Sequence, residues 1–272
     1  MILDAHGHLG PWADFHIPAP RAGDLVAMAD RLGVTAIGVS HLLAVGVDAP
    51  TGNRRALEAA DAFPGRLKVW LVANPHQRFD EGLLDHPAVW GVKLHPDVHR
   101  CALTDPRYGR VFELGVPVLA HGQTGTPWSD PERFAEVGRR HPTVPLLMGH
   151  AGLLPEGFHR AARLVADVPS VYLETCGSRM TGRWVARLVG MLGAGRVVFG
   201  SDASFLDLRV GLGRVLLAPL TDDDRAVVLG GTLLGGRSGS YGGSSGGFGG
   251  GWSPGSFGGS GTRARHGGGG RF

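Results

Sequence analysis

The chain has 272 residues, of which 43% are hydrophobic and 19% are charged, a composition typical of a globular protein with a sizeable core. Its two cysteines, Cys101 and Cys176, are too few for a disulfide framework. No apolar run is long enough to cross a bilayer as a helix. These features exclude a small disulfide-stabilised protein, give no membrane partner, and favour a cytoplasmic enzyme.

The charge is unevenly distributed. The formal net charge is +3, but four of the 27 basic residues and none of the 24 acidic residues lie in 235–272. The rest of the chain is nearly neutral, so we expect no specific nucleic-acid partner. About half of the residues in 235–272 are glycine, which loses much backbone entropy on ordering and has no side chain to bury. We therefore expect one folded domain over 1–234, followed by a disordered Gly/Ser-rich tail.

Apolar, β-branched runs alternate with amphipathic helical patterns through the first 234 residues. Strands are expected at 2–6, 34–40, 67–73, 89–95, 116–121, 144–150, 170–175 and 196–202. The intervening helical patterns include 22–32, 54–63, 130–140 and 158–168. Eight repeats of strand then helix predict a TIM-type (β/α)₈ barrel, with a doubly wound open sheet as the alternative.

Polar side chains recur where the expected strands end. They are, in chain order, His6, His8, Lys93, His95, His121, His150 and Asp202. In a closed barrel all C-terminal strand ends surround one mouth, where active sites of this architecture lie. The first and eighth strands are neighbours in such a barrel, so closure would place Asp202 beside His6 and His8.

The stretch DAHGHLG (4–10) holds two histidines one residue apart. Side chains alternate along a strand, so Asp4, His6 and His8 share a face, and two imidazoles at this spacing can bind one cation. Gly7 between them leaves space at a crowded point. An isolated pair of this kind also suits polar loop residues, but together with the other strand-end groups it indicates a metal site.

Five motifs in this order resemble the amidohydrolase superfamily, and specifically its amidohydrolase-related branch. They are DAHGHLG (4–10), GVKLHP (91–96), PVLAHGQTG (117–125), LLMGHAG (146–152) and VVFGSD (197–202). That branch includes aminocarboxymuconate-semialdehyde decarboxylase and related decarboxylases besides hydrolases. The resemblance implies a distorted barrel with one divalent metal, usually zinc. The implied ligands are His6, His8, His121 and Asp202, with His150 beside the metal.

The resemblance implies a metal-dependent hydrolase acting on a small organic substrate such as an amide, ester or lactone. A bound cation lowers the pKa of water to about 7. Asp202 would then accept its proton, and His150 would stabilise the developing oxyanion. Two alternatives remain open at this point, a non-oxidative decarboxylase of a small carboxylic acid and a non-catalytic barrel that acts as a binding protein.

Further residues have more than one interpretation. Lys93, His95 and Trp12 are expected to contact substrate, and Lys93 could instead carry a carbamate that bridges a second metal or extend along the barrel wall. Asp202 could also be the N-cap of a helix that begins near residue 204. Cys176 is expected to be a half-buried thiol or a substrate contact. A homo-oligomer is left open.

Overall fold

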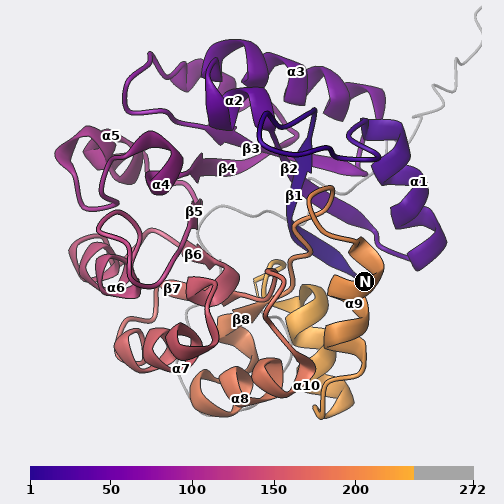
Figure 1. Cartoon of the computed structure of the whole chain (residues 1–272), viewed down its shortest axis with the longest axis vertical. Coiled ribbons are helices and arrows are strands. Elements are labelled where there is room, and N and C mark those ends of the chain that lie inside the picture. The colour runs from indigo at the N-terminus through magenta and orange to yellow at the C-terminus, as the bar shows by residue number, and fades with distance from the viewer. Residues whose placement is uncertain (236–272) are drawn as a thin grey trace, which may run out of the picture.

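A computed structural model describes residues 1–235, and the predicted tail lies outside the described residues apart from Gly235. Eight parallel strands form one sheet in the sequential order β1 to β8. Figure 1 shows them as a ring with the helices outside it. The strands are β1 (Leu3–Leu9), β2 (Ala36–His41), β3 (Leu67–Val72), β4 (Val89–Leu94), β5 (Val118–His121), β6 (Leu146–Gly149), β7 (Val171–Glu174) and β8 (Val197–Val198).

The chain after β8 closes the ring by returning to β1. The amide of Ala5 donates to the carbonyl of Phe199 at 3.0 Å, and the amide of Asp202 donates to the carbonyl of His6 at 2.8 Å. A parallel bridge between Gly7 and Ala203 completes this seam. The predicted TIM-type barrel is therefore confirmed, and the open sheet is excluded because its first and last strands would not pair.

The α-helices cover the outside of the ring (Figure 1). They are α1 (Ala22–Leu32), α2 (Leu42–Gly46), α3 (Ala49–Ala62), α4 (Pro96–His99), α5 (Gly109–Glu113), α6 (Pro131–Arg140), α7 (Pro155–Leu164), α8 (Gly182–Leu192), α9 (Leu208–Leu216) and α10 (Asp222–Ala226). Short 3₁₀ turns are η1 (Glu81–Asp85), η2 (Pro106–Tyr108), η3 (His150–Gly152) and η4 (Ala194–Arg196), and η5 (Val227–Gly231) is a π-helical turn.

The expected repeat of strand then helix fails at one connection. Between β3 and β4 the described chain has only the 3₁₀ turn η1. Pro75 and Pro87 lie in this connection, and proline lacks the amide proton that a continuous α-helix uses. Asp80 accepts a hydrogen bond from the Gly82 amide at 3.1 Å, which ties the backbone into a tight turn. A full helix therefore does not form there.

Two apolar layers hold the barrel together. One lies between the strands and the outer helices and contains residues such as Phe134, Phe158 and Leu188. The other fills the barrel and includes Leu3, Trp70 and Tyr172. A barrel of this size is packed with side chains along its axis, so polar groups gather at the strand ends rather than midway. Within residues 1–235, no helix is both long and apolar enough to cross a membrane.

Candidate active site

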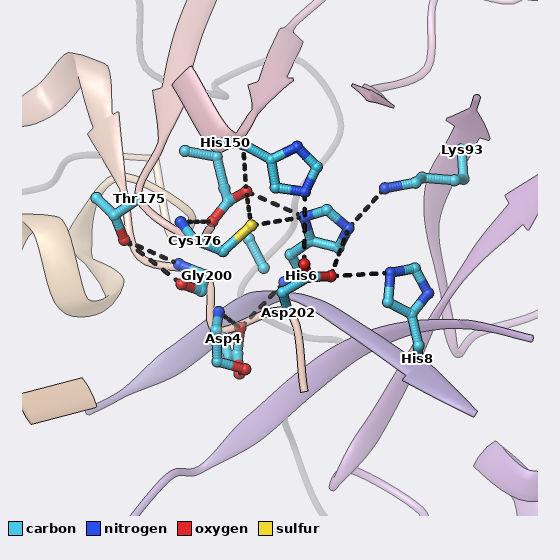
Figure 2. A network of polar contacts seen from close by, with 12 residues as sticks. Asp4, His6, His8, Lys93, His150, Thr175, Cys176, Gly200 and Asp202 are labelled. Atoms are coloured by element: carbon cyan, nitrogen blue, oxygen red, sulfur yellow. Dashed lines mark hydrogen bonds and ion pairs between the residues drawn. The ribbon is translucent and has the colours of Figure 1, made fainter. Parts of the chain in front are cut away.

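Strand ends and the segments just after them place a cluster of polar side chains at one end of the barrel. His6 and His8 extend from β1, and Lys93 extends from β4. His150 begins η3 directly after β6, and Asp202 follows β8. Figure 2 shows these five side chains pointing toward one another. The sequence prediction that they share one mouth is therefore confirmed for this group.

Asp202 is at the centre of the cluster. Its Oδ1 lies 3.1 Å from Nε2 of His8 and 3.8 Å from Nε2 of His6, while its Oδ2 lies 3.6 Å from Nε2 of His150. The four residues are almost completely buried. Asp202 is not a helix N-cap, because α9 begins at Leu208 and Asp207 caps it. Its carboxylate is thereby left to face three imidazoles, and we call these four residues the cage.

The backbone of β1 brings two of the cage residues together. The strand runs to Leu9, beyond the predicted end at residue 6, so His6 and His8 both lie on it. The pairing of β1 with β2 is irregular between Asp4 and Gly7. A Cβ at Gly7 would lie 2.8 Å from Cγ2 of Ile37 and 3.0 Å from the Ala203 carbonyl oxygen. Only glycine therefore fits between the histidines, as the sequence predicted.

His121 and His95 form the neighbouring edge of the site. The His121 ring stacks on the His95 ring with centroids 4.1 Å apart, and it lies 4.7 Å from the His150 ring. Its Nε2 is 3.8 Å from Oδ2 of Asp97. His95 follows β4, and its side chain accepts a hydrogen bond from the Val98 amide as the N-cap of α4. The ligand role of His121 and the substrate role of His95 stay predictions.

Burial sets the protonation of the cage. Burial lowers the pKa of His6 to about 3, with Lys93 adding to the effect, and it lowers the pKa of His8. Burial alone would raise the pKa of Asp202, but polar contacts with His150 and His8 hold it well below its ordinary value. At neutral pH the rings of His6 and His8 are therefore uncharged and Asp202 is ionised, which are the states that bind a cation.

The cage suits a divalent cation. Oδ1 of Asp202 is buried and accepts no hydrogen bond from the described residues, so it has a free lone pair beside the Nε2 atoms of His6 and His8. Imidazole nitrogen with carboxylate oxygen is a donor set for zinc, manganese or iron. A second combination is also close together, because donor atoms of His6, His150, Cys176 and Asp202 all lie within 4.8 Å of one another.

Lys93 and Cys176 both contact His6, from opposite sides of its ring. Nζ of Lys93 lies 2.6 Å from Nε2 of His6, and Sγ of Cys176 lies 3.3 Å from Nδ1. Burial lowers the pKa of Lys93 to about 8. Cys176 is fully buried rather than half-buried, and burial raises the pKa of its thiol well above the ordinary value. The thiol is therefore protonated.

Aromatic side chains adjoin the cage at His8. The Phe205 ring centroid is 4.8 Å from that of His8, and Phe205 is in turn 5.9 Å from Trp12 and 5.1 Å from Phe15. Trp12, Phe15 and Phe205 form what we call the aromatic wall. Trp12 thus adjoins Phe205, which in turn adjoins His8 of the cage, and its predicted contact with substrate stays a prediction.

Sequence reasoning missed the carboxylate of Glu174 near the cage, and it placed Asp4 on the same strand face as His6 and His8 without predicting its partners. Glu174, at the end of β7, lies with Oε2 3.0 Å from Nδ1 of His6. Asp4 accepts hydrogen bonds from the amide of His6 at 3.0 Å and from the amide of Ser201 at 2.9 Å. The signal available was an acidic residue inside an apolar strand, in SVYLET (170–175) and ILDAH (2–6), because buried acids are rare unless they have partners.

Solved structures that are similar to the chain in fold include the following three enzymes. A 5-carboxyvanillate decarboxylase from Sphingomonas paucimobilis has a TM-score of 0.65 at 15% identity, covering 85% of this chain and 96% of that one. A probable 2-pyrone-4,6-dicarboxylic acid hydrolase from Acinetobacter baumannii gives 0.62 at 15%, covering 84% and 96%. A dihydroxybenzoic acid decarboxylase from Polaromonas sp. JS666, with bound manganese and an inhibitor, gives 0.60 at 15%, covering 84% and 94%.

Among curated proteins no sequence matches the chain significantly. The model of the amidohydrolase family matches residues 3–232, which include every strand and all residues of the cage. The match confirms the resemblance inferred from the five motifs and gives no support to a non-catalytic barrel. The chain therefore belongs to the amidohydrolase family and is an enzyme.

Proposed function

We propose that this chain is a metal-dependent decarboxylase of a small, planar carboxylic acid, aromatic or otherwise unsaturated. The observation that carries the proposal is the position of His8. Its Nε2 lies 3.1 Å from Asp202 in the cage, while its ring lies 4.8 Å from Phe205 in the aromatic wall. A flat substrate stacked on this wall would present its reacting carbon to the cage.

The cage would hold one divalent cation through His6, His8 and Asp202, with His121 as the predicted fourth ligand. We expect zinc because imidazole suits it, and manganese is the second choice because it accepts carboxylate oxygen. When bound, such a cation polarises substrate oxygen atoms and acidifies water. The support is the donor set itself, because three buried groups converge and all three are deprotonated at neutral pH.

Asp202 would move the proton in this reaction. As an ionised carboxylate it takes a proton from a substrate hydroxyl or from water, and it then delivers that proton to the carbon that bears the carboxylate. The bond to the carboxyl carbon breaks, carbon dioxide leaves, and the electron pair of that bond returns to the unsaturated system. His150, with Nε2 3.6 Å from Oδ2 of Asp202, orients the carboxylate for both transfers.

Lys93 would bind the negative charge of the substrate. It is almost completely buried at the end of β4, and its Nζ faces the cage. A buried ammonium is a strong partner for a carboxylate or phenolate oxygen. Relatives in fold whose names state decarboxylation of 5-carboxyvanillate and of dihydroxybenzoic acid support this substrate class.

Hydrolysis is the second candidate, and the contact of His150 with Asp202 favours it. An imidazole next to a carboxylate could stabilise the oxyanion formed when water attacks an amide, ester or lactone. This was the first expectation from the sequence, and the name of the relative from Acinetobacter baumannii is consistent with it. The aromatic wall and Lys93 are the reasons to place decarboxylation first.

One experiment separates the two reactions. Protein loaded with zinc or manganese is incubated with hydroxybenzoic acids, unsaturated dicarboxylic acids, lactones and amides, and both carbon dioxide and newly released acid are measured. We expect labelled carbon dioxide from a ¹³C-carboxyl acid, and none from protein treated with a chelator. Release of acid from lactones or amides without carbon dioxide would overturn decarboxylation in favour of hydrolysis. Metal-free folded protein with neither activity would overturn both.

A further inference from the structure

Glu174 is fully buried, and every group around its carboxylate that forms a hydrogen bond is a donor. Oε2 lies 3.0 Å from Nδ1 of His6, and it accepts a hydrogen bond from the His150 amide at 3.1 Å. The thiol of Cys176 donates to the same oxygen at 2.8 Å, and the Cys176 amide donates to Oε1 at 2.5 Å. The Glu174 carboxylate thereby connects β7 by hydrogen bonds to His6 and His150, two residues of the cage.

The fold leaves a place for this carboxylate. A Cβ at Gly200, just after β8, would lie 2.0 Å from Oε1 of Glu174. Position 200 must therefore be glycine if Glu174 is to reach His6. Because His150 has a positive φ of 60°, which is uncommon for a residue with a side chain, the hydrogen bond from its amide to Glu174 also holds an unusual backbone geometry in place.

The two nitrogens of His6 face opposite kinds of partner. Nδ1 faces the carboxylate of Glu174, which can only accept, so this nitrogen carries the proton. Nε2 faces Nζ of Lys93 at 2.6 Å, and a lysine ammonium can only donate. Both contacts therefore select the Nδ1–H tautomer, in which the lone pair of Nε2 accepts from Lys93 and lies within 3.8 Å of Oδ1 of Asp202. Figure 2 shows His6 between Lys93 and Cys176 with Asp202 beside Nε2.

We propose that Glu174 is a positioning residue of the active site, which fixes the Nδ1–H tautomer of His6 and thereby presents Nε2 to the cation. The proposal rests on the proposed metal-dependent function. Through the amide of His150 the same carboxylate sets the start of η3, so it aligns two cage residues at once. Histidine ligands of metals commonly donate their second ring proton to a carboxylate, and removing that partner weakens metal affinity 10–100-fold.

The tautomer can be observed without any metal. In protein with ¹⁵N-labelled histidine, long-range ¹H–¹⁵N spectra of the ring separate a protonated from an unprotonated nitrogen, and His6→Asn assigns the signals. We expect wild-type His6 to be protonated at Nδ1. Glu174→Gln places an amide among donors, so we expect His6 to populate the other tautomer or exchange between the two. Wild-type His6 protonated at Nε2 would overturn the proposal even if the variant did not fold.

Metal affinity supplies the second readout. Titration with Co²⁺, followed by its visible absorption, should give an affinity 10–100-fold weaker for Glu174→Gln than for the wild type. Thr175→Val is the matched control, because it removes the buried hydroxyl next to Glu174, which hydrogen-bonds to Gly200, but keeps the hydrogen bond between Glu174 and His6. We expect that control to keep the wild-type tautomer and an affinity within about threefold, far from the loss that removal of the carboxylate causes.

The results that would overturn the role of Glu174 differ from those that would overturn the proposed function. An unchanged tautomer in Glu174→Gln, or a Co²⁺ affinity within about twofold of the wild type, would each overturn the positioning role, because the expected loss is much larger. A wild-type protein that binds no divalent cation would instead overturn the proposed function, while the ring spectra would still report on Glu174. The free energy of unfolding, measured for each variant by denaturant titration, identifies any general loss of stability.

Discussion

Nζ of Lys93 lies 2.6 Å from Nε2 of His6, so an ammonium group stands at the ring nitrogen that a metal cation would use. The lysine and the cation compete for one lone pair. We predict that Lys93→Met, which keeps the length of the side chain without its charge, binds Zn²⁺ several-fold more tightly by calorimetry. It should also lower kcat/KM about 10- to 100-fold, because a buried charged hydrogen bond to substrate is lost.

The same variant separates this role from the bridging role considered for Lys93. A carbamylated lysine is itself a metal ligand, so its removal would weaken metal binding. Weaker Zn²⁺ binding by Lys93→Met, together with activity that depends on added bicarbonate in the wild type, would contradict competition and favour the bridge.

His121 provides a test of the ligand set. We predict that His121→Ala loses stoichiometric zinc together with activity, because the variant lacks one imidazole of the predicted set of four protein ligands. His95→Ala is the matched control, since it removes the ring that stacks on His121 and should leave zinc bound. Metal content by elemental analysis decides the matter. If His150→Ala loses the metal and His121→Ala keeps it, the set of His6, His150, Cys176 and Asp202 is the better description.

Asp202 should be essential for the reaction. Asp202→Asn retains the shape of the side chain but cannot accept a proton, and we expect kcat to fall 10²- to 10⁴-fold. Asp222→Asn is a control at an aspartate whose side chain is completely exposed on α10, and it should keep full activity. Steady-state rates at saturating metal are the measurement. A variant at position 202 with more than about a tenth of the wild-type kcat would contradict a role in proton transfer, given that expected range.

The barrel could be predicted because its elements are local. Each strand is a short apolar run that begins within two residues of its predicted position, and β3 and β4 begin at the predicted residues 67 and 89. The ends of the first and last strands were less well predicted. β1 extends to Leu9, and β8 has only two residues, because their outer parts are held by bridges across the seam rather than by a regular ladder.

The cage was predictable for a different reason, since its ligands lie at strand ends and a barrel brings all such ends together. The contacts that support the cage could not be predicted from the sequence. The pairing of Glu174 with His6 joins residues 168 apart in the chain, and the pairing of Lys93 with His6 depends on which way each side chain turns inside the barrel. The alternation of side chains along a strand predicts which face of the sheet a residue is on, but not which residue it contacts. Only the three-dimensional structure shows that one histidine has a donor on one side and an acceptor on the other.

Asp4 should make stability depend on pH. Burial raises the pKa of Asp4 to about 7, although hydrogen bonds from Ser201 and the amide of His6 lower it. Between about pH 4 and pH 7 the folded protein therefore holds a proton that the unfolded chain has lost, so this group reduces stability as the pH rises through that window. Asp4→Asn, which is neutral throughout, should remove the effect.

The buried histidines have the opposite effect on stability. Burial lowers the pKa of His6 to about 3, so the free energy of unfolding rises with pH between about pH 3 and the ordinary pKa of histidine. Only the comparison between Asp4→Asn and the wild type isolates Asp4. We predict that the variant gains roughly 2 kcal/mol in relative stability between about pH 5 and pH 8 by denaturant titration. A difference that is constant with pH would contradict a raised pKa for Asp4.

Gly7 should be necessary for both stability and metal binding. A methyl group there would lie 2.8 Å from Cγ2 of Ile37 and 3.0 Å from the carbonyl oxygen of Ala203, so β1 would have to move away from β2 and from the seam. Overpacking of this kind costs about 1–3 kcal/mol. We therefore predict that Gly7→Ala lowers the free energy of unfolding by that amount and weakens zinc binding, because His6 and His8 flank the displaced residue.

Gly213→Ala is the matched control for this change. Gly213 lies within α9, and a methyl group added there would have no neighbouring atom within 4 Å, while alanine favours a helix by about 0.5–1 kcal/mol over glycine. The control should thus be slightly more stable than the wild type and bind zinc normally. Gly7 differs from Gly213 in the crowding at the seam and not in residue type. Equal stability of the two variants would therefore show that β1 can shift without disturbing its neighbours. Unchanged zinc affinity in Gly7→Ala would show that Gly7 does not determine the spacing of His6 and His8.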